Sequence, residues 1–287
     1  MTSTPRTAKT TPATAEESPS RAASRYQQLR SHLAELKLTA AAEALPAVLD
    51  QATAEGLSLT VALERLLAVE VDASTARRLA GRLRFACLPT PATLADFDVD
   101  AAGIDRKLID ELGTCRYLQS ATNILLIGPP GTGKTHLSVG LARAAAHAGY
   151  RTYFTTAADL AARCHRAAIE GRWATTMRFY AGPTLLVIDE LGYLPLPAEA
   201  ASALFQVVSQ RYLKTSIVIT TNRGVGKAHL FARTCAEVAS KHDVFAGIRV
   251  QRVGRAVGHR RGDRRGRSSL LRVSSRMLPR RVSDPSC

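Results

Sequence analysis

The chain of 287 residues has few cysteines and no long apolar run. No apolar stretch approaches the roughly 18 residues that a helix needs to cross a bilayer, so we expect neither an integral membrane protein nor a membrane partner. Residues 1–25 are rich in Thr, Ser, Ala, Pro and Arg and lack an apolar stretch, so we expect no secretory signal. The five cysteines are scattered and never spaced Cys-x-x-Cys, which argues against a disulfide framework or a zinc site. A cytoplasmic protein is the expectation.

Acidic residues are scarce at the C-terminal end. Residues 223–287 hold 16 Lys and Arg against four acids, whereas the other 222 residues carry a net charge of only +3. The formal net charge of +15 therefore belongs mostly to this end of the chain, and the body is nearly neutral.

The residue pattern divides the chain into four parts. Residues 1–25 are expected to form a disordered tail, because they have too little apolar surface to offset the cost of ordering. Residues 26–118 are expected to form a small helical domain, followed by a core at 119–226 and an atypical, poorly ordered Arg-rich region at 227–287. The helical domain is indicated by leucines at helical spacing, namely Leu29, Leu33, Leu36, Leu59, Leu63, Leu66 and Leu67.

Short apolar runs alternate with helical stretches in the third part. Such alternation is typical of an α/β fold, with a parallel sheet covered by helices on both faces. The strands are expected at Asn123–Ile127, Thr152–Thr155, Thr184–Ile188 and Ser216–Thr221, and the helices at His136–Ala148, Ala158–Glu170 and Ala198–Leu213.

A phosphate-binding motif lies between the first of these strands and the first helix. Residues 128–135 read Gly-Pro-Pro-Gly-Thr-Gly-Lys-Thr and match G-x-x-x-x-G-K-[ST] in full. The glycines let successive backbone N–H groups face one anion, and the helix N-terminus adds partial positive charge. We expect Lys134 to bridge the β- and γ-phosphates and the Thr135 hydroxyl to bind Mg²⁺. The expected nucleotide-binding residues are Gly128, Pro129, Pro130, Gly131, Thr132, Gly133, Lys134, Thr135 and His136.

Acidic residues end the third expected strand, at Leu-Leu-Val-Ile-Asp-Glu. Asp189 is expected to hold the metal together with Thr135, and the adjacent Glu190 to orient or deprotonate the attacking water. Asn222 ends the fourth strand, where its amide can contact both the γ-phosphate and the water. We therefore expect Glu190, Lys134 and Asn222 to be the catalytic residues, although two surface charges and a common turn are the simpler alternatives.

Motifs of other P-loop classes are missing. The sequence contains neither the Asn-Lys-x-Asp motif that recognises guanine nor the Leu-Ser-Gly-Gly-Gln signature of transporters. The Asp-Glu pair favours the hydrolytic branch of P-loop proteins, in which an added strand lies between the P-loop strand and the Asp-Glu strand.

These motifs resemble a known family. The chain is similar to the AAA+ subfamily that contains IstB-type insertion-sequence helper proteins, with DnaC-type helicase loaders as relatives. The resemblance runs from Tyr26 to Arg223, and the segment Ile-Asp-Glu-Leu-Gly-Tyr-Leu-Pro-Leu is more specific than the P-loop itself. The segments that carry it are 36–38, 54–58, 77–84, 94–97, 128–137, 188–196, 204–205, 211–212 and 220–223.

The resemblance implies a P-loop (AAA+) fold and an ATP-dependent helper of a DDE-type transposase. Such helpers bind duplex DNA, form homo-oligomers on it, deliver the transposase to its target, and use ATP and Mg²⁺. The resemblance implies that residues 26–118 are a DNA-binding and oligomerisation domain and that residues 119–226 are the ATPase core. Two alternatives stay open: a DnaC-like loader of a replicative helicase, and a degenerate copy that binds ATP and DNA without efficient hydrolysis. The arginines expected to contact DNA are Arg77, Arg78, Arg82 and Arg84, although a solvated helix face explains them nearly as well.

The resemblance ends after residue 226. The family carries a trans-acting arginine finger and an Asp-Arg-Leu segment beyond this point, and no such segment is present here. Residues 251–287 contain 11 Arg and neither Lys nor aromatic residues. An Arg-rich DNA-binding arm, an inert charged tail and a change of reading frame each account for this composition. Arg211 is expected to have a structural role on its helix rather than to act as the trans finger.

Overall fold

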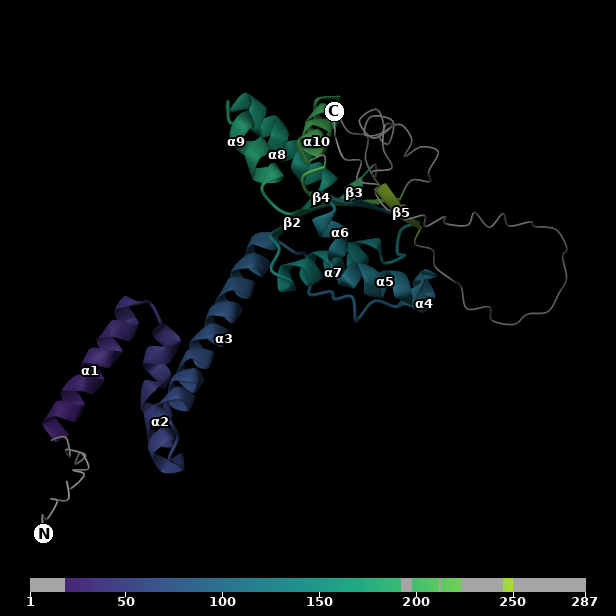
Figure 1. Cartoon of the computed structure of the whole chain (residues 1–287). Coiled ribbons are helices and arrows are strands. Elements are labelled where there is room, and N and C mark those ends of the chain that lie inside the picture. The colour runs from purple at the N-terminus through teal and green to yellow at the C-terminus, as the bar shows by residue number, and fades with distance from the viewer. Residues whose placement is uncertain (1–18, 192–197, 212, 223–244, 250–287) are drawn as a thin grey trace, which may run out of the picture. The chain divides into compact units, whose positions relative to one another are not determined.

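The computed structural model describes residues 19–191, 198–211, 213–222 and 245–249 (Figure 1). The chain divides into two units, residues 1–253 and 254–287, and every described residue belongs to the first. In the described part of the chain, no helix has both the length and the apolar character that crossing a membrane requires.

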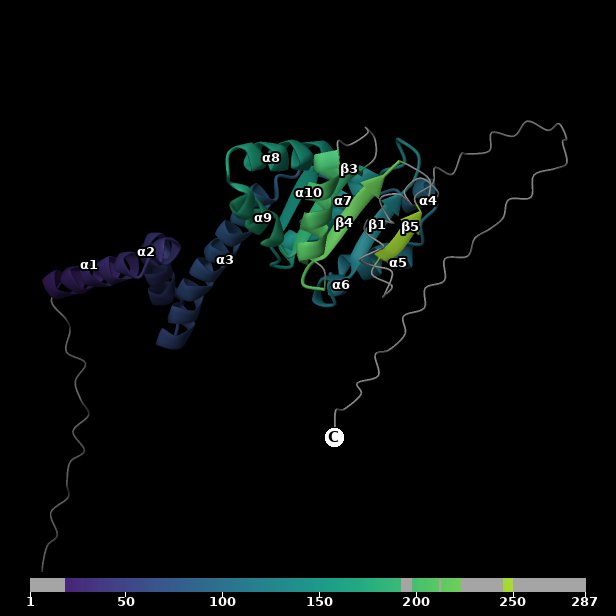
Figure 2. The ribbon, with the colours of Figure 1, turned by 90° about the horizontal axis from the view of Figure 1, so that it is seen from above.

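A five-stranded parallel sheet forms the centre of the second half of the described chain (Figure 2). Its strand order is β2-β3-β4-β1-β5, so β4 lies between the P-loop strand β1 and the Asp-Glu strand β3, which confirms the expected added strand. Because β3 and β4 are buried almost throughout, they suit positions covered on both faces. The strands are β1 (Asn123–Ile127), β2 (Thr152–Thr156), β3 (Leu185–Leu191), β4 (Ser216–Thr221) and β5 (Phe245–Arg249).

Strand β5 departs from the expectation for the C-terminal part. Residues 245–249 lie inside the region expected to be atypical and poorly ordered, yet they pair in parallel with β1 along its whole length. The segment begins with the apolar residues Phe245 and Ala246, which suit a strand. The expectation of poor order was based instead on the Arg-rich composition of residues 251–287. The rest of 227–287, including the helix considered for 228–241, lies outside the described residues.

Helices cover both faces of the sheet, as Figure 1 shows. One hydrophobic core joins the sheet to α4–α7, and a second joins it to α8–α10. These helices are α4 (Val99–Ala102), α5 (Arg106–Gly113), α6 (Arg116–Gln119), α7 (Lys134–His147), α8 (Ala157–Ile169), α9 (Trp173–Ala181) and α10 (Ala198–Arg211).

The boundary expected at residues 118 and 119 is wrong as a division between cores. Phe97, Ile109, Leu112 and Leu118 pack in the same hydrophobic core as β1 and α7. Helical periodicity identified this stretch as helical but could not show which apolar partner it packs against. The core around the parallel sheet therefore includes the helices α4–α6.

Three helices precede this core: α1 (Pro19–Glu35), α2 (Thr39–Glu55) and α3 (Leu59–Ala86). Ser58 caps the N-terminus of α3 by accepting a hydrogen bond from the Val61 N–H at 3.4 Å. Because α1 begins at Pro19, the last seven residues of the expected tail are helical. The helices enclose a third, smaller core of apolar side chains, namely Leu33, Ala41, Ala42, Leu45, Val48 and Leu66.

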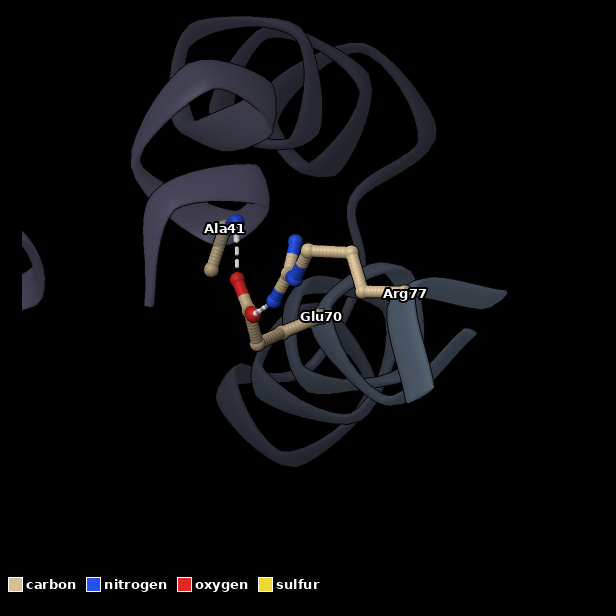
Figure 3. A network of polar contacts seen from close by, with 3 residues as sticks. All are labelled: Ala41, Glu70 and Arg77. Carbon is tan, nitrogen blue, oxygen red and sulfur yellow. Dashed lines mark hydrogen bonds and ion pairs between the residues drawn. The ribbon is translucent and has the colours of Figure 1, made fainter. Parts of the chain in front are cut away.

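A buried carboxylate joins α2 to α3 (Figure 3). Leu38, at the N-cap of α2, makes no side-chain cap, and Glu70 of α3 instead accepts the Ala41 N–H at 3.0 Å. Arg77 donates to the other oxygen of Glu70 at 2.5 Å. The hydrogen bond from Ala41, and then the one from Arg77, lower the pKa of Glu70. Glu70 thus serves as an N-cap that comes from a neighbouring helix.

The C-terminal end of α3 and the segment after it lie against α7 and β2. Arg82 donates to the Ala146 carbonyl at 2.8 Å, and the Phe85 ring centroid lies 5.6 Å from that of Tyr153. Residues 88–97, which we name the connector, then lie along α7. Arg143 of α7 donates to the carbonyls of Ala92 at 3.0 Å and Thr90 at 3.1 Å. These contacts lead the chain from the helical region to the phosphate-binding loop.

Candidate nucleotide-binding site

The loop between β1 and α7 has the backbone conformation that its glycines allow. Gly131 and Gly133 have φ angles of +76° and +87°, which non-glycine residues rarely adopt. Gly128 donates its N–H to the Thr221 carbonyl at 3.3 Å, which ties the start of the loop to β4. Helix α7 begins at Lys134 without a side-chain cap, so its first N–H groups point toward the loop. This arrangement suits a bound anion.

Lys134 places a buried ammonium group inside this loop. Its Nζ donates to the Pro129 carbonyl at 2.6 Å and to the Thr132 hydroxyl at 3.4 Å, and the residue is 6 % exposed. Burial lowers the pKa of Lys134, while the charge of Asp189 opposes that shift. Because both hydrogen-bond partners are neutral oxygens, an anion beside Nζ would be strongly favoured.

Thr135 and Asp189 meet across the start of α7 and the end of β3. The Thr135 Oγ1 donates to Asp189 Oδ2 at 2.8 Å, and Asp189 is buried. The second carboxylate oxygen, Oδ1, accepts a hydrogen bond from the Thr220 hydroxyl. The structure thus brings together the two residues that the sequence nominates as metal ligands, and it adds Thr220 as a partner that sequence reasoning did not identify.

Glu190 differs from its neighbour Asp189 in both exposure and backbone. Its side chain is exposed, and its φ angle is +59°, in the left-handed region. That region costs a non-glycine residue about 1–2 kcal/mol, so contacts nearby must maintain it. The Glu190 N–H donates to the Thr220 Oγ1 at 2.9 Å. One carboxylate is therefore buried and hydrogen-bonded while the next faces solvent, an arrangement that lets the two have different roles.

Asn222 and His136 have different neighbours in the structure. Asn222 follows β4 directly and is half-buried, at the carboxyl edge of a strand that neighbours both β1 and β3. The ring of His136, in the first turn of α7, contacts the connector instead: its Nε2 lies 3.1 Å from the Thr93 carbonyl. The His136 ring therefore contacts the connector, which the P-loop motif alone did not indicate.

Phe97 is a second residue of the site that sequence reasoning missed. A Cβ built on Gly133 would lie 2.9 Å from the Phe97 Cε2, so the ring occupies the space beside the last loop glycine. The Phe97 and His136 ring centroids are 5.6 Å apart. The connector thus touches the phosphate-binding loop directly.

The four arginines expected to bind DNA fall into two pairs. Arg77 is bound to Glu70, and Arg82 is bound to the Ala146 carbonyl, so both hold the protein together. Arg78 and Arg84 are exposed on α3.

Arg211 is buried at the end of α10. It donates to the carbonyls of Tyr180 at 2.6 Å and Ser216 at 2.8 Å and is 1 % exposed. Burial lowers its pKa to about 10. Arg211 therefore joins α9 and β4 within one subunit, in agreement with the structural role expected for it.

The fold and the loop together define an AAA+ P-loop ATP-binding protein, with an added strand between β1 and β3 and a helical region before the core. The model of the IstB-like ATP binding protein family matches residues 31–236, and this chain belongs to that family. The match to this family model extends ten residues beyond residue 226, after which the sequence motifs no longer resemble the family.

Relatives in several insertion sequences are similar to the chain. An ATP-binding protein of insertion sequence IS5376 from Geobacillus stearothermophilus is 36 % identical over 202 residues, which cover 70 % of this chain and 80 % of the relative. The ATP-binding protein of IS21 from Pseudomonas aeruginosa is 35 % identical over 198 residues, covering 69 % of this chain and 75 % of the relative.

Solved structures resemble the chain more distantly. The DnaC helicase loader matches with a TM-score of 0.46 and 22 % identity, over 55 % of this chain and 96 % of that protein. The AMPPCP-bound DnaA from Aquifex aeolicus matches with a TM-score of 0.47 and 24 % identity over 56 % of this chain. The chain spans about half the length of that DnaA, 51 %.

Proposed function

We propose that the protein is a cytoplasmic ATPase that binds duplex DNA and helps a DDE-type transposase, hydrolysing ATP to ADP and phosphate. The observation that carries the ATPase part is the contact of Thr135 with Asp189, at 2.8 Å, beside the buried ammonium of Lys134. A hydroxyl and a carboxylate are oxygen ligands of the kind that Mg²⁺ prefers, and a lysine is the cation that polyphosphates require. The residues present therefore fit both ATP and Mg²⁺.

Each of these residues has a distinct task in the proposed reaction. Lys134 neutralises charge on the β- and γ-phosphates, and the N–H groups of the loop donate hydrogen bonds to the phosphate oxygens. Thr135 and Asp189 hold the metal, which when bound neutralises charge on the phosphate oxygens. Glu190, being exposed at the edge of the sheet, orients the attacking water and accepts its proton. Asn222 at the end of β4 contacts the γ-phosphate and the water.

DNA binding rests on the exposed arginines and on the relatives. Arg78 and Arg84 leave their guanidinium groups free to approach phosphates, and exposed basic side chains supply the sequence-independent part of DNA affinity. The relatives are ATP-binding proteins of insertion sequences, which supports the transposase as the partner. A DnaC-like loader remains the alternative, and copurification with a transposase rather than with a hexameric helicase separates the two.

A homo-oligomer is supported by an apolar ridge on α3. Four large apolar side chains with a spacing of four residues, Leu59, Leu63, Leu67 and Val71, are 76 %, 49 %, 50 % and 62 % exposed. An i, i+4 row is the ridge that packs into the grooves of another helix, and exposed apolar patches mark protein contacts. The leucine stripe that indicated a helix here is therefore mostly on the surface, with only Leu66 buried among its leucines in α3.

Phosphate release with and without duplex DNA tests the proposal, using the wild type beside Glu190→Gln. The substitution preserves size and hydrogen bonding but removes the base, so the rate is expected to fall by about 10²–10⁴-fold while ATP still binds. Glu111→Gln, on the exposed side of α5, is the matched control and is expected to leave the rate unchanged. Equal rates for Glu190→Gln and the wild type would exclude this mechanism, and ATP binding without hydrolysis in the wild type would identify a degenerate copy.

A further inference from the structure

Two residues of β3 stand opposite a single residue of β4 at the carboxyl edge of the sheet. The register of the two strands shifts between Ile188 and Leu191, so Asp189 and Glu190 of β3 face Thr220 of β4. A two-against-one pairing of this kind is a β-bulge, which interrupts the hydrogen-bond ladder and redirects the side chains of the bulged strand. The bulge thus contains both carboxylates, the buried Asp189 and the exposed Glu190.

The hydroxyl of Thr220 supplies the hydrogen bonds that the interrupted ladder lacks. Its Oγ1 accepts the Glu190 N–H at 2.9 Å and donates to Asp189 Oδ1. Thr220 is 2 % exposed, so water has little access to replace either bond. The same hydroxyl therefore joins the backbone of the exposed carboxylate to the side chain of the buried one.

We propose that Thr220 is a positioning residue for ATP hydrolysis. Its hydroxyl holds the Glu190 backbone at its φ angle of +59°, and this backbone aims the carboxylate at the attacking water. In the left-handed region the side chain leaves the strand in a direction that a β conformation does not give. The inference rests on the proposed hydrolysis and adds a residue that acts through the backbone of Glu190.

Loss of the hydroxyl should affect the Glu190 backbone more than the fold. Thr220→Val replaces one oxygen with a methyl group of similar size and keeps the β-branched shape that suits a strand. The Glu190 N–H then has no partner opposite the bulge, and the backbone is free to leave the unfavourable region. The Glu190 carboxylate would then no longer be held toward the attacking water, and misplacement of a reacting group by about 1 Å costs roughly 10²-fold in rate.

The test compares Thr220→Val, Thr220→Ser and wild type in single-turnover hydrolysis, ATP affinity and thermal unfolding. We expect Thr220→Val to lower the hydrolysis rate by about 10–100-fold with the Kd for ATP within about twofold, and Thr220→Ser, which keeps the hydroxyl, to recover most of the rate. Thr152→Val is the matched control, because that buried hydroxyl on β2 has no hydrogen-bond partner among the described residues. It should leave rate and affinity unchanged.

A double-mutant cycle with Glu190→Gln shows whether Thr220 acts through Glu190. If it does, Thr220→Val lowers the rate by less than about threefold in the Glu190→Gln background, because the two changes remove one function. Equal fold-losses in both backgrounds, a rate for Thr220→Val within twofold of wild type, or failure of Thr220→Ser to recover would each overturn the inference. Should Thr220→Val not fold, Thr220→Ala removes the same hydroxyl and the same criteria apply. A wild type without hydrolysis would instead overturn the proposed function.

Discussion

The hydroxyl of Thr135 donates to the carboxylate of Asp189 at 2.8 Å, and this contact joins the first turn of α7 to the end of β3. The two residues are 54 positions apart in the sequence. Parallel strands bring their carboxyl ends to one edge of a sheet, and the P-loop helix starts at that same edge. A hydroxyl oxygen and a carboxylate from two separate motifs thus lie next to each other.

Asp189→Asn should separate metal binding from nucleotide binding. The substitution keeps the size of the side chain and removes its negative charge, so affinity for ATP in the presence of Mg²⁺ is expected to fall by about 10–100-fold. Affinity for nucleotide without Mg²⁺ should change little, because Lys134 and the loop are intact. Isothermal calorimetry with and without Mg²⁺ measures both. Asp72→Asn, on the exposed side of α3, is the control, and equal MgATP affinity in both variants would contradict the metal role of Asp189.

Gly140→Ala should loosen the connector from α7. A Cβ at this position would lie 3.1 Å from the Leu94 backbone N and 3.2 Å from the Thr93 carbonyl carbon, so the connector must shift. We expect a loss of about 1–3 kcal/mol in the free energy of unfolding, measured by chemical denaturation. At Gly81 of α3 an added Cβ meets nothing within 4 Å. Gly81→Ala is therefore expected to stabilise by about 0.5–1 kcal/mol, and a similar loss in both variants would argue against the contact.

Glu70 should make the helical region sensitive to acid. Its pKa is lowered in the folded state by Ala41 and Arg77, so its contribution to stability is fully present above its unfolded pKa of about 4.3. The contribution is lost as the pH falls through the lower, folded pKa. In Glu70→Gln the amide cannot ionise, so thermal stability should depend less on pH below about 5 than in the wild type. Glu64→Gln, exposed on the same helix, should keep the wild-type dependence; identical profiles for all three proteins would contradict the cap.

Arg78 and Arg84 should contribute to DNA affinity, whereas Arg77 and Arg82 should contribute to stability. The double variant of Arg78 and Arg84 to Ala is expected to reduce the slope of log K against log salt by roughly 2, at about 0.9 per phosphate contact, without lowering the melting temperature. Arg77→Ala and Arg82→Ala should lower the melting temperature, because each removes a partner from a hydrogen-bonded group. Salt titration of DNA binding and calorimetry measure the two effects. If the slope of log K against log salt is unchanged in the double variant, Arg78 and Arg84 do not contact DNA.

Leu67→Asp should reduce self-association. The side chain is 50 % exposed within the apolar ridge of α3, so a charge there leaves the fold intact but would be buried in a contact between copies. Light scattering after size exclusion, with ATP and duplex DNA, should show a smaller mean mass than for the wild type. Leu213→Asp, at a residue 58 % exposed outside the helical region, should keep the wild-type mass. If Leu67→Asp assembles as the wild type does, the ridge is not the contact.

Local patterns were sufficient to predict much of this protein. Strands β1 and β4 have the bounds that their apolar runs indicated, and the P-loop lies between a strand and a helix as its motif requires. The family was identified from contiguous segments. Each of these features depends on residues that are neighbours in the chain, so the sequence carries the information directly.

Contacts between distant segments were decided only by the tertiary structure. Thr220 lies opposite Asp189 and Glu190 because a bulge shifts the register of β3 and β4, and nothing in either strand's pattern reveals that shift. Likewise, periodicity identified the leucines of α3 as one stripe but could not show that most of it faces outward, because burial depends on which surface packs against it. The sequence determined which chemical groups are present and in which elements; packing between elements decided which of those groups meet.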